Sequence, residues 1–113
     1  MNGIMAPDGH HNNALHWQEL EAWRKKIDAL DQELTALLCE RLECARHIIA
    51  LKSDIGEAVL QPEREKEVLA NVLGKAGHEL THKALGNIYK CILEESRLFQ
   101  QECKKKTGQG DSN

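Results

Sequence analysis

Residues 20–55 read LEAWRKKIDALDQELTALLCERLECARHIIALKSDI, and this stretch decides the fold. Its large apolar side chains recur every seven residues, in two interleaved series. The first series is Leu20, Ile27, Leu34, Arg41, Ile48 and Ile55, and the second is Trp23, Leu30, Leu37, Cys44 and Leu51. Such a sustained heptad is typical of one long helix that packs along an apolar seam.

The length of this helix predicts an oligomer. A helix of about 38 residues, at about 1.5 Å per residue, is about 57 Å long. A folded monomer of 113 residues has a radius of gyration of only about 13 Å, so two shorter helices cannot cover the whole seam. We therefore expect a homodimer, most simply a two-fold one, in which the long helices pack on one another.

The rest of the chain is predicted to form two further helices and two tails. Pro62 suits the first position of a second helix, and residues 63–73, EREKEVLANVL, carry an apolar stripe before Gly74 and Gly77 end it. A third helix is expected over residues 79–103. Its buried positions are expected to be Leu85, Ile88, Ile92, Leu93 and Phe99. Residues 1–15 and 104–113 lack an apolar period and are predicted to be flexible tails around one domain, residues 16–103. No strand pattern competes, so the fold class is all-α.

Composition and charge exclude several classes of function. The chain has 15 Lys and Arg against 18 Asp and Glu, a net charge of -3, which gives no general attraction to nucleic acid. The longest apolar run is residues 48–51, far short of the roughly 18 residues of a membrane span, and no export signal is recognisable. The four cysteines form no C-x-x-C pair and are expected to be free thiols. We expect a cytoplasmic protein with no membrane or nucleic-acid partner.

Arg41 is the one seam residue that does not suit a plain coiled coil. A buried guanidinium needs a partner. A structural interpretation makes Arg41 a register-setting residue, or one that reaches the surface and pairs with an acid. The functional alternative is an anion site inside the bundle. Lys52 lies eleven residues further on, about three helical turns, so both cations point to nearly the same side. Arg24 points at least a quarter-turn away, which suits a different partner surface.

The sequence motifs favour neither a metal site nor a catalytic nucleophile. Residues 78–82, HELTH, fit the zinc motif H-E-x-x-H, but a third ligand is missing and the segment stands at a glycine-flanked helix start, where charged residues are usually solvated. The chain contains no G-x-S-x-G sequence and no glycine-rich phosphate loop. We therefore expect no metal and no cofactor.

Cations and amides distributed over all three helices are the remaining candidates for chemistry. They are Arg24, Arg41, Lys52, Arg64 and Gln100. A set of this kind suits the binding of a small dianion, with any catalysis arising from positioning and electrostatics.

The segments RKKIDALDQELTALLCERLECARHIIALK, PEREKEVL and ILEESRLFQQ together resemble the all-helical, AroQ-type chorismate mutases, over roughly residues 17–103. The resemblance implies an intertwined homodimer with three helices per chain and two equivalent sites. It implies rearrangement of chorismate to prephenate in the biosynthesis of Phe and Tyr, a unimolecular step that needs no cofactor. The dimer predicted from helix length agrees with this.

The resemblance also implies roles for residues that hold the carboxylates and the ether oxygen. Arg24 matches the Arg that enters the partner's site, and Arg41 matches the Arg that binds a carboxylate within its own chain. Ser96 matches a Ser that contacts a carboxylate. Lys52 and Gln100 match the two donors to the ether oxygen of the breaking bond, and would stabilise its growing charge.

At the start of the second helix, Arg64 and Glu65 match an Arg-Glu pair whose Glu accepts a hydrogen bond from the ring hydroxyl of chorismate. Gln61 departs from the pattern, because some members have an acidic residue there. Two alternatives stay open: an isochorismate-pyruvate lyase of the same fold, in which the position of Glu65 looks apolar, and a non-catalytic helical dimer acting as an adaptor. The adaptor leaves Arg41, Lys52 and Gln100 without a role.

Overall fold

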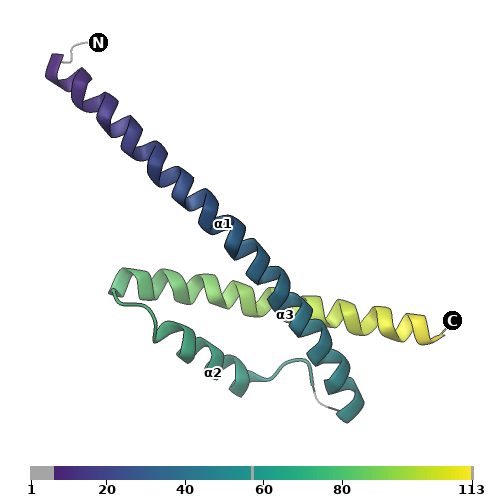
Figure 1. Ribbon diagram of the computed structural model, residues 1–113. Helices are drawn as coiled ribbons and strands as arrows, with labels where there is room; N and C mark the ends of the chain where they lie inside the picture. The colour runs from purple at the N-terminus through teal and green to yellow at the C-terminus, as the bar shows by residue number, and fades with distance from the viewer. Residues whose placement is uncertain (1–6, 57, 113) are drawn as a thin grey trace. The chain divides into compact units, whose positions relative to one another are not determined.

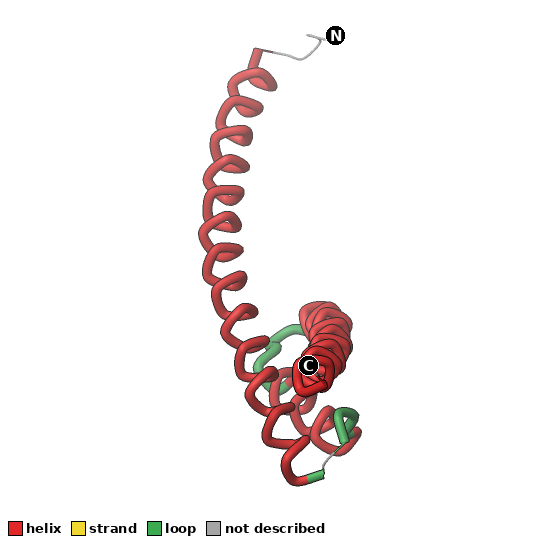
Figure 2. The backbone as a smooth tube through the Cα atoms, turned by 90° about the vertical axis from the view of Figure 1, so that its right-hand side faces the viewer, coloured by secondary structure: helices red, strands yellow, loops and turns green. Residues whose placement is uncertain are grey.

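Three α-helices and two short loops make up the chain in the computed structural model, which describes residues 7–56 and 58–112 (Figures 1 and 2). Helix α1 spans Pro7–Ile55, α2 spans Pro62–Leu73 and α3 spans Glu79–Ser112. The part of the chain described contains no strand. The all-α class, the three helices and the long first helix are thus confirmed.

The helix ends follow local signals in the sequence. After Ile55, Gly56 takes a left-handed backbone with φ of 77°, a conformation that glycine adopts without steric cost. Pro62 occupies the first position of α2, where its missing N–H has no helical acceptor to lose. At the other end of α2, the N–H of Gly74 donates to the carbonyl of Ala70. These signals place α2 where the sequence predicts it.

Two of the helices run further than the sequence predicts. Helix α1 begins at Pro7 and α3 continues to Ser112, whereas residues 1–15 and 104–113 were expected to be tails. A helix can continue without an apolar face as long as no residue breaks it, so periodicity alone does not set its ends. Residues 1–6 and 113 lie outside the described residues, and the division into tails and domain stays a prediction.

The chain divides into two units, residues 1–39 and residues 40–113. In the first unit, none of residues 13–39 is buried. Its heptad seam is open to solvent: Trp23 is 58% exposed and Leu37 60% exposed. Within this unit, the described residues therefore leave the seam exposed.

The second unit contains the small core. Ala45 and Ile49 of α1 are its buried apolar side chains, and α2 packs on α3 through a half-buried stripe of Val68, Leu69 and Val72. On α3, Leu85, Ile92, Leu93 and Phe99 are half-buried. The prediction that Ile88 is buried was wrong for the single chain, because Ile88 lies at the edge of that helix face and is 57% exposed.

Candidate active site

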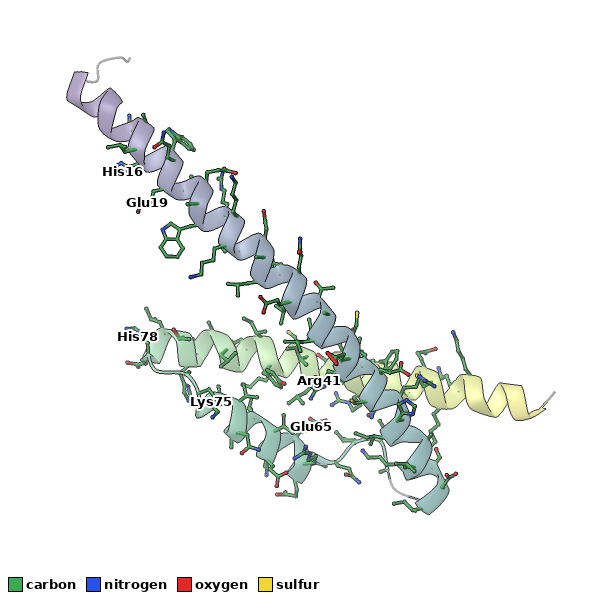
Figure 3. All side chains as sticks on the ribbon, viewed as in Figure 1. His16, Glu19, Arg41, Glu65, Lys75 and His78 are labelled. Atoms are coloured by element: carbon green, nitrogen blue, oxygen red, sulfur yellow. The ribbon has the colours of Figure 1, made fainter. Side chains whose placement is uncertain are left out.

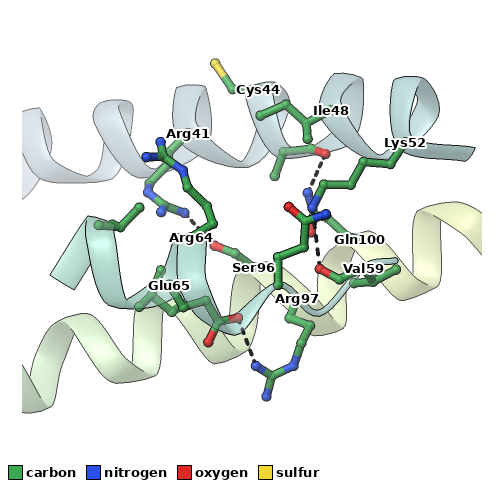
Figure 4. Close-up of a pocket in the computed structure, with 14 residues that line it drawn as sticks. Arg41, Cys44, Ile48, Lys52, Val59, Arg64, Glu65, Ser96, Arg97 and Gln100 are labelled. Carbon is green, nitrogen blue, oxygen red and sulfur yellow. Dashed lines mark hydrogen bonds and ion pairs between the residues drawn. The ribbon is translucent and has the colours of Figure 1, made fainter. Parts of the chain in front are cut away.

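A cavity of about 470 Å³ lies within the second unit, between the end of α1, the α1–α2 loop, α2 and α3 (Figure 4). Six of the seven residues predicted to form a site line it. They are Arg41, Lys52, Arg64, Glu65, Ser96 and Gln100. Gln61 also lines it. The fold thus brings together side chains that are as many as 59 positions apart in the sequence, from Arg41 to Gln100.

The seventh residue, Arg24, belongs to the first unit. Its side chain is 59% exposed, and its Nη1 lies 3.9 Å from a carboxylate oxygen of Glu21, one turn earlier on α1. Such an exposed pair contributes little to stability. The guanidinium is therefore available to another binding partner at small energetic cost.

Arg41 is held in place by two residues of α3. Its Nη1 donates a hydrogen bond of 2.7 Å to Oγ of Ser96, and its guanidinium carbon lies 5.6 Å from the centre of the Tyr89 ring. Among the described residues, no carboxylate lies within ion-pairing distance of Arg41. Its charge is thus oriented toward the cavity without being neutralised, which is the arrangement that an anion requires.

Gln100 presents its amide from a buried position. Its Nε2 donates a 2.9 Å hydrogen bond to the backbone carbonyl of Ala45 on α1, and the residue is only 8% exposed. A primary amide carries two N–H donors, so one fixes the orientation of the group and the second is left for a ligand. Ser96, one turn earlier on α3, is equally buried.

Lys52 reaches from the last turn of α1 toward the α1–α2 loop. Its Nζ donates to the carbonyl of Val59 at 3.5 Å, the long limit for a hydrogen bond, and the residue is half-buried. An ammonium has three donors, so at least two stay free to bind a ligand. Lys52 and Gln100 both line the same end of the cavity (Figure 4).

The first turn of α2 carries two charged residues with different environments. Arg64 is 62% exposed and pairs with Glu67, one turn later on the same helix. Glu65 is half-buried and pairs across to α3, where Nη1 of Arg97 lies 3.2 Å from its Oε2. Figure 4 shows this ion pair beside the cavity.

The cavity is cationic overall. Four cationic side chains and a single carboxylate line it, against an apolar background of Ile48, Val59, Val68 and Leu93. The cations are Arg41, Lys52, Arg64 and Arg97. Positive charge on low-dielectric walls favours a small, multiply charged anion over a neutral ligand. Binding of a dianion by these residues stays a prediction.

In this structure, the first histidine of the H-E-x-x-H segment binds a backbone N–H at the start of α3. His78 precedes the first turn of α3, and its Nδ1 accepts a hydrogen bond from the N–H of Leu80 at 3.1 Å (Figure 3). His78 therefore acts as a helix cap. Among the side chains that the structure describes, no three potential ligands gather around a metal site. None of the described helices combines the length and the apolar character that a membrane span requires.

Comparison with known proteins gives the family. The model of the family described as chorismate mutase type II matches residues 23–101, which include all seven predicted site residues. The chain belongs to the chorismate mutase type II family.

Some relatives within the chorismate mutase type II family are about as long as this chain, and others are longer, bifunctional proteins. The chain is 32% identical over 91 residues to a bifunctional chorismate mutase/prephenate dehydratase of Aquifex aeolicus, covering 77% of this chain and 25% of that protein. It is 25% identical over 91 residues to a chorismate mutase of Methanocaldococcus jannaschii, covering 80% of this chain and 92% of the relative. It thus spans about a quarter of the length of the bifunctional relatives.

A solved structure agrees with the fold of this chorismate mutase type II chain. It is a crystal structure of chorismate mutase from Helicobacter pylori in complex with prephenate. The two share 35% sequence identity with a TM-score of 0.69, over 78% of this chain and 96% of that one. The three-helix arrangement is therefore found in a protein that was crystallised with prephenate.

Sequence reasoning missed three contributors to the site of this family member. Tyr89 contacts Arg41, the carbonyl of Ala45 orients Gln100, and Arg97 pairs with Glu65. No local spacing signals the last pair, because Arg97 and Glu65 are 32 residues apart on different helices. The one available sign was that Arg97 directly follows Ser96 on α3.

Proposed function

We propose that this chain is a chorismate mutase that rearranges chorismate to prephenate. Membership of the chorismate mutase type II family supports this, as does the similarity to the Helicobacter pylori chorismate mutase that was crystallised with prephenate. The observation that carries the proposal is the cationic cavity, because it gathers four cationic side chains and the amide of Gln100 around one small space. A unimolecular rearrangement of a dicarboxylate needs these groups and no nucleophile.

Binding selects the compact conformer of the substrate. Arg41, supported by Ser96 at 2.7 Å and by Tyr89, binds one carboxylate from within the chain. Arg64 at the start of α2 also lines the cavity and adds positive charge to it. Holding both carboxylates of a flexible substrate brings the reacting carbon atoms together, so part of the entropy cost of the reaction is met on binding.

Catalysis then comes from stabilising charge on the ether oxygen. Negative charge grows on this oxygen as the C–O bond lengthens, and Lys52 together with the free N–H of Gln100 donates to it. Gln100 is preoriented by Ala45 at 2.9 Å, so it does not have to reorganise as the charge develops. Each preorganised donor of this kind contributes about 3 to 4 kcal/mol when water is excluded.

Glu65 accepts a hydrogen bond from the ring hydroxyl of the substrate, which favours chorismate over isochorismate. A carboxylate at this position suits a hydroxyl placed as in chorismate. A site built to bind a hydroxyl discriminates against a ligand that places the group elsewhere, because the hydrogen bond between the hydroxyl and the carboxylate is then lost. Isochorismate-pyruvate lyase activity is accordingly the weaker alternative.

The active form is a homodimer in which Arg24 enters the site of the partner chain. The open heptad seam of the first unit supports this, since Trp23, Ile27 and Leu30 are each more than half exposed in a single chain. Burial of these apolar side chains between two chains favours dimer formation. The weakly paired guanidinium of Arg24 lies on the same unit and is free to bind a carboxylate of the partner's substrate. A biosynthetic role in the cytoplasm is consistent with this activity.

A transition-state mimic of the rearrangement tests the proposed site. A ligand that binds only the folded protein at 100 times its Kd stabilises it by about 2.7 kcal/mol, so the mimic should raise the melting temperature of the wild type. In Arg41→Ala the shift should be lost, while in Arg46→Ala, which removes an exposed arginine outside the cavity, it should be kept. A wild-type melting temperature that the mimic leaves unchanged would favour the helical adaptor.

A further inference from the structure

Glu65 is held by a residue to which neither the spacing nor the family resemblance assigns a role. Nη1 of Arg97 on α3 lies 3.2 Å from Oε2 of Glu65 on α2. The two side chains are only 26% and 31% exposed, so this pair is the least solvated of the ion pairs in the described residues (Figure 4). A partly buried pair of this kind is screened less by solvent and salt than the exposed pairs along α1 and α2.

Three residues within one turn of α3 organise the cavity from one side. Ser96 accepts the hydrogen bond from Arg41 on α1, Arg97 pairs with Glu65 on α2, and Gln100 donates to the carbonyl of Ala45 on α1. One turn of helix thus fixes groups from both neighbouring helices. Arg97 is the only link in this turn between α3 and the proposed hydroxyl acceptor.

We propose that Arg97 is a positioning residue for Glu65. Arg97 binds Oε2 and leaves Oε1 to accept the hydrogen bond from the ring hydroxyl of chorismate. A glutamate on the first turn of a helix has three rotatable side-chain bonds, and without an anchor it samples several rotamers. The guanidinium restricts this freedom before the substrate arrives, so the acceptor does not lose that entropy on binding. This inference rests on the proposed role of Glu65.

The test compares variants of Arg97 on two substrates. They are chorismate and an analogue of chorismate that lacks the ring hydroxyl. Arg97→Ala should lower kcat/KM for chorismate about tenfold, a coupling typical of paired side chains in contact, and should change kcat/KM for the analogue by less than about twofold. Arg97→Lys, which keeps the charge, should recover part of the loss. Arg46→Ala, which removes the exposed pair between Arg46 and Glu43, is the matched control and should behave as wild type on both substrates.

A double-mutant cycle with Glu65→Gln separates positioning from a purely structural effect. If Arg97 acts through Glu65, adding Arg97→Ala to Glu65→Gln should cost less than about threefold further on chorismate. Additive losses, equal losses on both substrates, or a gain of activity in Arg97→Ala would overturn the proposal; a gain would mean that Arg97 withholds Glu65 from the substrate. Circular dichroism melts check folding, and Arg97→Gln replaces Arg97→Ala if the alanine variant does not fold.

The cycle also separates this inference from the role on which it rests. Loss of activity in Glu65→Gln with full activity in Arg97→Ala would overturn the positioning role alone. Full activity on chorismate of Glu65→Ala, which removes the acceptor altogether, would overturn the role of Glu65 itself, and with it the positioning role of Arg97.

Discussion

Replacing Lys52 by alanine should remove most of the catalytic rate and little of the stability. In the part of the chain that the structure describes, the ammonium donates a long, 3.5 Å hydrogen bond to the carbonyl of Val59, and such a bond contributes at most about 1 kcal/mol to folding. Its proposed partner in the transition state is the charged ether oxygen, where loss of one preorganised donor costs about 3 to 4 kcal/mol. The account therefore predicts a fall in kcat of about two to three orders of magnitude.

The assay for this variant is the loss of the diene absorbance of chorismate at saturating substrate, alongside a thermal melt. Lys52→Met retains the length of the side chain without its charge, so it should be as inactive as Lys52→Ala if the charge is what matters. Lys105→Ala removes an exposed lysine that pairs with Glu102 on α3, and it should retain wild-type kcat. A kcat for folded Lys52→Ala within about threefold of wild type would refute the reasoning.

Three further predictions concern the dimer, the shared site and pH. Leu30→Glu places a charge on the open seam and should convert the dimer to a monomer, which light scattering would detect as half the mass. A dimer of unchanged mass would contradict the proposed interface. Mixing inactive Arg24→Ala with inactive Lys52→Ala by refolding should restore about a quarter of wild-type activity, because half of the dimers then have one intact site; no recovery would mean that Arg24 serves its own chain. The hydrogen bond from Arg46 lowers the pKa of the exposed Glu43 carboxyl below 4.5. The small contribution of the ionised Glu43 to stability is therefore present above pH 4.5 and is lost as the pH falls through the lowered pKa. The melting temperatures of wild type and Glu43→Gln should accordingly converge in acid, and a difference that widens there would contradict this prediction.

The sequence predicts those features of the fold that depend on single residues or on a periodic apolar pattern. Pro62 and the glycines after residue 73 marked the start and end of α2, because these residues restrict the backbone by themselves. The heptad gave the long first helix, and the spacing of eleven placed Arg41 and Lys52 on one side of it, as the cavity requires. The helix ends at Pro7 and Ser112 were missed, since neither is set by an apolar period.

The support of the site could not be predicted, because it depends on tertiary packing. Tyr89 contacts Arg41 only once α3 lies beside α1, and the carbonyl of Ala45 has no side-chain signature at all. The same limit applies to Arg97, whose partner is on another helix. Sequence patterns identified which groups could bind a dianion, whereas the fold determines which neighbours orient them.

Identification of the product formed from chorismate decides whether the chain is a mutase. Purified protein is added to chorismate, the loss of diene absorbance is followed, and the product is identified by NMR. The account predicts prephenate as the single product. Unchanged chorismate would contradict it; release of pyruvate when isochorismate is then supplied would instead identify a lyase, and inactivity on both substrates would leave the helical adaptor as the better account.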